Sequence, residues 1–153
     1  MREIFLSYRF TGEDPKDLEK VLGTIKCKLL NSGHKVFCSY FLEEYFKEQG
    51  MTSKDIYSYC LERQADCNTF IALVKSEHKS NGMELESARA IELNQNYILL
   101  IKPELVFPHF RSAAHQTIEY NSFFQLYQRL EKLIWITWII LKSCTEFFYI
   151  EFY

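Results

Sequence analysis

Short apolar runs alternate with longer amphipathic segments along most of this chain, and this alternation constrains the fold more than any other feature. Runs suited to buried strands lie at 4–6, 35–38, 70–74, 97–101 and 116–120. Segments with the 3.6-residue period of helices lie at 16–31, about 53–64, 84–93, from about 110, and 122–132. Strands that alternate with helices predict an α/β fold, a flavodoxin- or Rossmann-like three-layer sandwich with a parallel five-stranded sheet.

Local signals support these elements. Asp14 before Pro15 fits a helix cap and first helical position, because the missing proline N–H costs nothing there. Gly33 follows the same helix and tolerates the left-handed backbone of a helix stop. The run 70–74 is apolar throughout, as expected for a central strand covered on both faces. The acidic, aromatic segment 41–50 is predicted as a helix or a structured loop over the end of the second strand.

The composition argues against several classes of protein. The chain of 153 residues carries a formal net charge of −2, without the clustered basic excess that a nucleic acid polymer requires. Its 5 cysteines include no C-x-x-C pair, so we expect free thiols and no metal site. The amino terminus runs directly into a strand pattern without the features of a signal peptide. A cytoplasmic location is therefore predicted.

The last 21 residues differ from the rest, because the segment 133–153 holds both tryptophans and five other aromatic residues. Its longest apolar run, 133–141, falls short of the ~20 residues that a membrane span needs. Such a segment is expected to pack on the domain, to be buried between subunits or to promote aggregation. We therefore predict a domain at 1–132 and an apolar, aromatic-rich C-terminal extension at 133–153.

Ligands of open α/β sheets bind outside the carboxyl ends of the strands, which here nominates the loops 7–14, 39 onward and 75–82. In the last of these, Ser80-Asn81-Gly82 leads into a helix that holds Glu84 and Glu86. A helix start binds anions, and a carboxylate one turn inside the helix suits a nucleophile for sugar chemistry. The same pattern is also ordinary helix capping, and the spacing alone leaves both interpretations open.

The segment from Ser80 to Ala90 resembles the S-x-G-x-x-x-E-x-G-x-A signature of the nucleoside 2-deoxyribosyltransferase family, which includes the 2′-deoxynucleoside 5′-phosphate N-hydrolases. The segment 4–14 resembles that family's first strand and nucleobase-binding loop. Ala65-Asp66 matches the A-D pair that precedes its central strand. The resemblance extends from residue 3 to about residue 132.

This resemblance implies cleavage of the N-glycosidic bond of a deoxynucleoside or its 5′-monophosphate, or transfer of the deoxyribosyl group, without a cofactor. The family's glutamate nucleophile corresponds to Glu86. Glu84 is the competitor, because some members have G-M-E-L at this point, but the distance to the following strand favours Glu86. The resemblance further implies that Asp66 orients the substrate or the nucleophile.

The remaining family positions concern substrate binding. Ser80 and the main chain of Gly82 would hold the 5′ end of the sugar, and a phosphate there would favour the monophosphate hydrolases. The residues that would line the base or phosphate side are Ser7, Tyr8 and Arg9. Family members are usually homo-oligomers, so a homodimer or higher homo-oligomer is expected.

Two residues depart from the family pattern. Ala88 replaces a usual glycine, and its methyl group is expected to crowd the sugar or the helix packing. Ser58 stands near a usual aspartate, so the acid that assists base departure is missing or is replaced by Asp55. Two alternatives remain. One is a TIR-like NAD glycohydrolase or signalling domain, since that family shares a flavodoxin-like sheet, an early S-Y-R-like strand end and a catalytic glutamate. The other is a nucleotide-binding protein without turnover.

Overall fold

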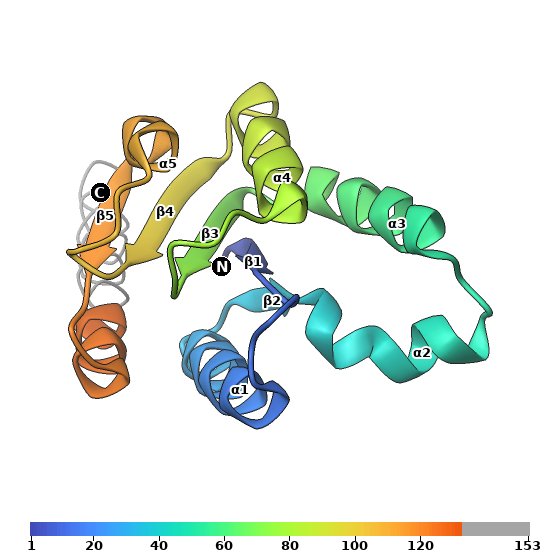
Figure 1. Ribbon diagram of the computed structural model, residues 1–153, viewed down its shortest axis with the longest axis horizontal. Helices are drawn as coiled ribbons and strands as arrows, with labels where there is room; N and C mark the ends of the chain where they lie inside the picture. The colour runs from blue at the N-terminus through green and yellow to red at the C-terminus, as the bar shows by residue number, and fades with distance from the viewer. Residues whose placement is uncertain (133–153) are drawn as a thin grey trace, which may run out of the picture.

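The computed structural model describes residues 1–132 and confirms the predicted α/β fold (Figure 1). Five parallel strands form one sheet in the flavodoxin-like order β2-β1-β3-β4-β5. The strands are β1 (Glu3–Tyr8), β2 (Lys35–Phe37), β3 (Thr69–Val74), β4 (Asn96–Ile101) and β5 (Gln116–Glu119). The helices are α1 (Pro15–Asn31), the 3₁₀ helix η1 (Ser39–Leu42), α2 (Glu43–Glu48), α3 (Ser53–Ala65), α4 (Asn81–Glu92), α5 (Pro108–Ala113) and a further helix at 123–132.

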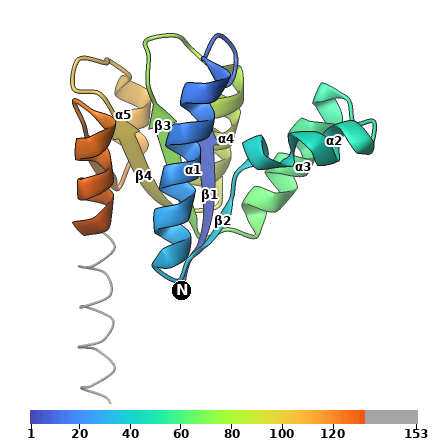
Figure 2. The same cartoon turned by 90° about the horizontal axis from the view of Figure 1, so that it is seen from below.

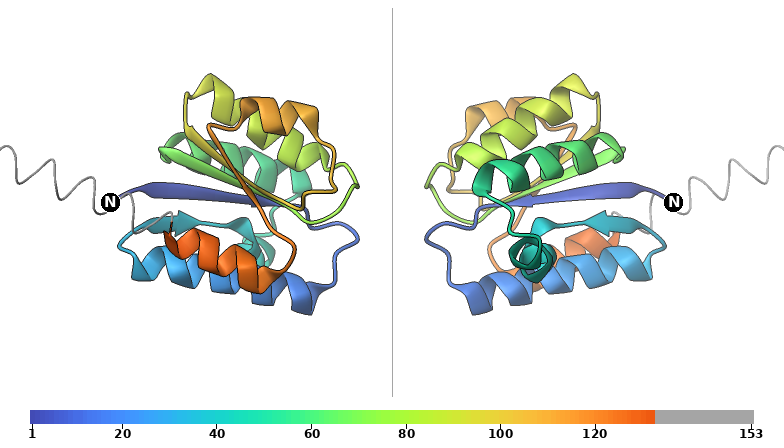
Figure 3. Two further views of the ribbon diagram at one scale, coloured as in Figure 1. Left: turned by 90° about the vertical axis from the view of Figure 1, so that its left-hand side faces the viewer. Right: turned by 90° about the vertical axis from the view of Figure 1, so that its right-hand side faces the viewer.

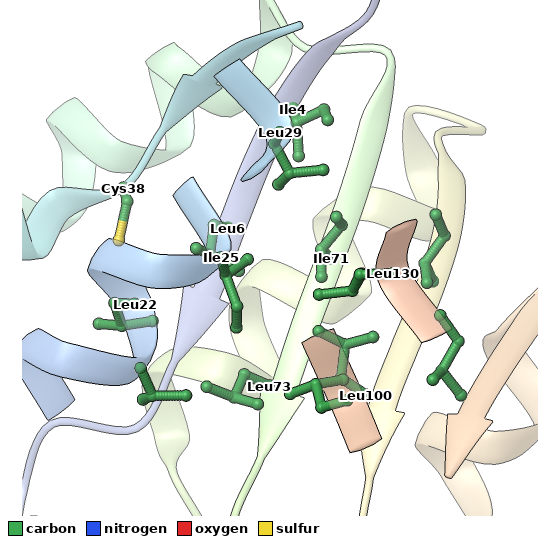
Figure 4. Close-up of a cluster of buried hydrophobic side chains, with 14 of the residues drawn as sticks. Ile4, Leu6, Leu22, Ile25, Leu29, Cys38, Ile71, Leu73, Leu100 and Leu130 are labelled. Atoms are coloured by element: carbon green, nitrogen blue, oxygen red, sulfur yellow. The ribbon is translucent and has the colours of Figure 1, made fainter. Parts of the chain in front are cut away.

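Successive side chains of each strand point to opposite faces of the sheet, which produces two cores. Ile4 and Leu6 of β1 pack against α1 and the helix at 123–132, in the cluster shown in Figure 4. Phe5, between them, packs on the other face with residues of α3, α4 and α5. Figure 3 shows these two helical layers on either side of the sheet. The face on which Phe5 lies is also the face of Ser7, which becomes important for the site.

Three local signals act as the sequence predicts. The Asp14 carboxylate caps α1 by accepting a hydrogen bond from the main-chain N–H of Asp17 at 2.9 Å. Gly33 has a φ of +79° directly after this helix. The segment predicted as a helix or loop at 41–50 forms the second half of η1 and all of α2. Figure 2 shows α2 and α3 beyond the β2 edge of the sheet, opposite α5 and the helix at 123–132.

One boundary differs in a way that matters for function. Helix α4 begins at Asn81, three residues before the predicted start at Glu84, because the Ser80 hydroxyl caps it by accepting the N–H of Met83 at 3.4 Å. The start of α4 therefore lies directly at the predicted ligand loop. None of the helices described within residues 1–132 has the length and apolarity to cross a bilayer. The predicted extension at 133–153 lies outside the described residues and stays a prediction.

Candidate active site

A cavity of about 560 Å³ opens beside the carboxyl end of β1. From β1 the chain passes to β2 on one side and then to β3 on the other, so the strand order reverses at β1. Ligands of such folds bind at this switch point of the sheet. The lining comes from the loop after β1, from η1, from α3 and from the start of α4: Tyr8, Arg9, Phe10, Thr11, Ser39, Ser53, Ile56, Tyr57, Cys60, Lys79, Ser80, Asn81, Gly82 and Glu86. Five of the eight predicted site residues are thus brought together: Tyr8, Arg9, Ser80, Gly82 and Glu86.

Glu86 reaches the cavity from the second turn of α4 and is the only carboxylate among the described residues that line it. The hydroxyl of Ser7, on the same face of the sheet, donates a hydrogen bond to Oε2 of Glu86 at 2.5 Å. Burial raises the pKa of Glu86 to about 7, while the bond from Ser7 opposes this rise. The carboxyl group therefore changes its ionisation close to neutral pH.

The sequence placed Ser7 on the substrate side, and the structure gives it another position. Ser7 is buried, with 1% of its surface exposed, and it does not line the cavity. It stands behind Glu86 because the alternation of β1 turns it under α4. Ser7 therefore acts on a ligand only through the carboxylate of Glu86.

The main chain of Glu86 is also held from outside α4. The side-chain amide of Gln64, at the end of α3, donates to the carbonyl oxygen of Glu86 at 2.7 Å. Gln95 completes this buried network by donating to the main-chain carbonyl of Gln64 at 2.7 Å. Two glutamines therefore fix α4 against α3 at the level of the candidate nucleophile.

The start of α4 forms one wall of the cavity, where its unpaired N–H groups and its positive dipole end favour an anion. The absence of a side chain at Gly82 has a steric reason. A Cβ added at Gly82 would lie 2.5 Å from the hydroxyl oxygen of Tyr57 on α3. Glycine at this position therefore lets the hydroxyl of Tyr57 approach the main chain of α4 and line the same cavity.

Positive charge stands near this helix start. Arg9 donates to the hydroxyl of Ser76 at 3.0 Å and lies 3.6 Å from the carboxylate of Glu13. Glu13 also pairs with Lys75 at 2.9 Å, which ties the loop after β1 to the loop after β3. Lys79, in the second of these loops, lines the cavity and is exposed. The cavity is therefore suited to a ligand that carries an anionic group.

The groups that surround Glu86 keep their protons at neutral pH. The hydroxyl of Tyr8 lies 3.2 Å from Oγ of Ser39, and burial raises the pKa of Tyr8. Burial and the charge of Glu86 also raise the pKa of Tyr57 and bring that of Cys60 to about 11. In this cluster, Glu86 is the group whose charge changes near pH 7.

Glu84, the predicted competitor of Glu86, lies outside the cavity lining. Its carboxylate faces α5, where Oε1 lies 3.2 Å from Nε2 of His109. Two positions along a helix turn a side chain by about 200°, so Glu84 and Glu86 point to different sides of α4. The geometry therefore favours Glu86 for chemistry in the cavity.

Asp66 does not lie in the cavity either. It follows α3 and precedes β3, and therefore stands at the amino end of the strands, whereas the cavity is at their carboxyl ends. Its carboxylate pairs with Arg63 at 2.8 Å on the surface. The expectation that Asp66 orients the substrate or Glu86 finds no support in this placement.

The two departures from the family pattern also lie away from the cavity. Ala88 is exposed and does not line the cavity, so its methyl group does not crowd a sugar there. Ser58 is exposed as well. Asp55 accepts hydrogen bonds from the N–H and hydroxyl of Thr52 in a capping box, and these bonds lower the pKa of Asp55. Asp55 is therefore unsuited to replace a missing acid.

Sequence reasoning missed the contribution of α3. Four residues of this helix line the cavity, namely Ser53, Ile56, Tyr57 and Cys60. Their spacing of three, one and three is that of a single helix face, and this was the available signal. Within residues 1–132, no three His, Cys, Asp or Glu side chains are grouped as metal ligands.

The sheet order and the cavity define an α/β protein of the flavodoxin-like class with a half-buried carboxylate, that of Glu86, at its switch point. No family profile and no curated protein sequence matches the chain. Among solved structures, the chain is similar to the CMP N-glycosidase BcmB of Clostridium botulinum, with a TM-score of 0.66 and 18% identity over 86% of this chain and 99% of that one.

Two further structures share this arrangement. A 2-deoxyribosyltransferase of Bacillus psychrosaccharolyticus aligns with a TM-score of 0.60 and 16% identity, over 84% of this chain and 90% of that one. A conserved protein of Enterococcus faecalis aligns with a TM-score of 0.61 and 10% identity, over 86% of this chain and 98% of that one. The fold of the described chain is thus the fold of 2-deoxyribosyltransferase-like structures, as the sequence resemblance predicts.

Proposed function

We propose that this protein is an enzyme that cleaves the N-glycosidic bond of a nucleoside 5′-monophosphate, with Glu86 as the nucleophile. The observation that carries the proposal is the position of the Glu86 carboxylate, held by Ser7 in a cavity whose wall is the start of α4. The similarity of the fold to an N-glycosidase and a 2-deoxyribosyltransferase supports this class of reaction. The sequence resemblance points to deoxyribose as the sugar.

The proposed reaction has two displacements. The free Oε1 of Glu86 attacks C1′ of the sugar. The new C1′–O bond forms as the C1′–N bond breaks, and the electron pair of the C1′–N bond leaves with the base. A solvent proton completes the released base. Water then attacks C1′ and gives up a proton, and the electron pair of the broken C1′–O bond returns to Glu86. Attack by the nitrogen of a second base, instead of water, makes the protein a transferase.

The charges around the cavity support a monophosphate over a free nucleoside. A phosphate at the start of α4 would meet the Ser80 hydroxyl and the helix N–H groups. Arg9 and Lys79 line the same cavity and supply positive charge. Glu86 lies in the second turn of α4, so a phosphate bound at the helix start would leave the sugar of the same nucleotide on the side of its carboxylate.

The decisive experiment measures base release from a panel of deoxynucleosides, ribonucleosides and their 5′-monophosphates, with and without an acceptor base. We expect release from a monophosphate, and a loss of at least about a thousandfold in Glu86→Ala, because the nucleophile is gone. Glu84→Ala is the matched control on the same helix and is expected to keep most of the activity.

Three outcomes would contradict the proposal. Full activity in Glu86→Ala removes the nucleophile assignment. Release of nicotinamide from NAD alone favours the TIR-like alternative. Nucleotide binding without base release, unchanged in Glu86→Ala, favours a binding protein without turnover. Homo-oligomeric assembly and a cytoplasmic location stay predictions.

A further inference from the structure

The hydroxyl of Ser7 lies buried beside Glu86 and neither forms nor breaks a bond in the proposed reaction. Its side chain is almost completely inaccessible, and its oxygen lies 2.5 Å from Oε2 of Glu86. Within residues 1–132, no other side chain donates a hydrogen bond to this carboxylate. The hydroxyl of Ser7 is therefore the side-chain donor that orients the Glu86 carboxylate among the described residues.

The position of Ser7 is fixed by the sheet. Ser7 pairs in register with Ala72 of β3, and both residues are buried. The sheet therefore fixes the main chain and Cβ of Ser7, and only rotation about χ1 of this buried side chain could move its hydroxyl away from Glu86. A donor on such a rigid element restrains its acceptor more tightly than a donor on a loop.

We infer that Ser7 is a positioning residue for Glu86, one that binds Oε2 so that Oε1 is directed into the cavity for attack. This inference rests on the proposed function of Glu86 as a nucleophile. A hydrogen bond to one carboxylate oxygen restricts rotation of the group and favours its ionised form. Both effects raise the fraction of molecules whose carboxylate is ready to react.

The ionisable groups that face Glu86 make this role measurable. They are Tyr8 on β1, Cys38 after β2, and Tyr57 and Cys60 on α3. Burial raises the pKa of each of them, to about 12 for Cys38 and about 11 for Cys60, so they stay neutral between pH 5 and pH 9. The 5′-phosphate of a monophosphate substrate also titrates in this range, with a second pKa of about 6, so an acidic limb of kcat/KM is assigned to Glu86 only where the NMR titration gives the same midpoint.

Ser7→Ala tests the inference, because it removes the hydroxyl and leaves a small side chain in the same buried place. Ser87→Ala is the matched control: Ser87 follows Glu86 on α4 and is buried, but its hydroxyl bonds to the hydroxyl of Tyr97 at 2.8 Å. Both variants lose one buried hydroxyl next to the site. Only Ser7→Ala loses the contact with the carboxylate.

Two measurements are compared in the full chain: the pH profile of kcat/KM, and a pH titration of the Glu86 carboxyl carbon by NMR, assigned with Glu86→Gln. In Ser7→Ala we expect the midpoint of both curves to move to higher pH by about one to two units. We expect kcat at pH 7 to fall about 10- to 100-fold. In Ser87→Ala both midpoints should stay within a few tenths of a unit of the wild type.

The NMR titration does not depend on turnover, which separates the two ways of failing. An unmoved midpoint in Ser7→Ala overturns the positioning role, whatever the activity. Equal falls of kcat in the two variants with unmoved midpoints show a purely structural effect. If the midpoint moves but wild-type protein releases base from no member of the panel, the proposed function fails, and the catalytic part of the inference fails with it.

Discussion

The hydroxyl of Tyr57 on α3 occupies the space that a side chain at Gly82 on α4 would need. An added Cβ would lie 2.5 Å from the Tyr57 oxygen but 3.4 Å from its ring carbon Cζ. The oxygen alone therefore creates the conflict. Because Tyr57 and Gly82 both line the cavity, this contact joins two of its walls.

The first prediction follows from this contact. Gly82→Ala should stabilise the protein less than Gly23→Ala, by about 1 kcal/mol, although both glycines are helical and alanine favours helices. Gly23 is the matched control, since nothing lies within 4 Å of its added Cβ. In a Tyr57→Phe background the difference should shrink, because the clashing oxygen is gone, and the remainder reflects the first-turn position of Gly82. Denaturant unfolding of the four variants measures this, and equal gains in the original background would show that Tyr57 moves aside without cost.

The second prediction concerns the stability of the fold against pH. The pKa of Glu86 is raised by burial from 4.5 to about 7, so the folded state binds the proton more tightly than the unfolded state. Between these values the folded state holds more protons, and stability falls as the pH rises from about 4.5 through about 7. Above pH 7 the loss from this group is complete.

Glu86→Gln, which stays neutral, should therefore be more stable than wild type at pH 8, by at most about 3 kcal/mol. Near pH 4 the two proteins should be similar. Denaturant midpoints at the two pH values test this, with Glu62→Gln as the control at an exposed position. If Glu86→Gln raises the free energy of unfolding at pH 8 no more than Glu62→Gln does, the ionised carboxylate of Glu86 does not destabilise the fold.

The fold followed from the sequence because its signals are local. The alternation of strand and helix patterns, the Asp14-Pro15 helix start and the glycine stop each depend on a few adjacent residues. The start of α4 was placed three residues late, because the predicted helix began with its first acidic residue instead of with the Ser80 cap. The pattern Ser80-Asn81-Gly82 also fits ordinary helix capping, but its spacing does not say which of the three residues caps the helix.

The site was predictable only in part, because it depends on which face of each element is turned inward. Ser7 was expected to touch the substrate, but strand alternation turns it towards Glu86. The resemblance implies that Asp66 acts on the substrate or on Glu86, although a residue before β3 stands at the other end of the sheet. Tyr57 was absent from the prediction because only the contact between α3 and α4 brings it to the cavity.

The third prediction concerns the two loops beside the cavity. Glu13 pairs with Lys75 at 2.9 Å and Arg9 at 3.6 Å, and all three side chains are largely buried. Glu13→Ala would leave two partly buried cations without their partner, so we expect a loss of about 2–3 kcal/mol in the free energy of unfolding. Glu3→Ala breaks the exposed pair with Lys35 and should cost less than about 1 kcal/mol.

Amide hydrogen exchange gives the local readout for this pair of variants. In Glu13→Ala the amides of the loop 75–82 should exchange faster, because the loop has lost its anchor to the segment after β1. In Glu3→Ala, which lies at the other end of the sheet, this loop should be unaffected. Unchanged exchange in Glu13→Ala would show that Arg9 and its bond to Ser76 hold the loop without the carboxylate.

The last prediction separates the two supports of Glu86. Gln64 is fully buried and donates to the main-chain oxygen of Glu86 at 2.7 Å and to the side chain of Gln95 at 3.2 Å. Gln64→Met keeps a side chain of similar length but removes the donor, and should cost about 2–3 kcal/mol in denaturant unfolding. Gln116→Ala, on the exposed surface of β5, should cost almost nothing.

The pH profile then distinguishes a support of the main chain from a support of the carboxylate. In Gln64→Met the bond from Ser7 to Oε2 is retained, so the acidic limb of activity should stay within a few tenths of a unit of the wild type. If the acidic limb of Gln64→Met moves as far as we expect for Ser7→Ala, then α4 shifts when Gln64 is lost. Glu86 would then be positioned by the contact of α3 with α4 as much as by the central strand.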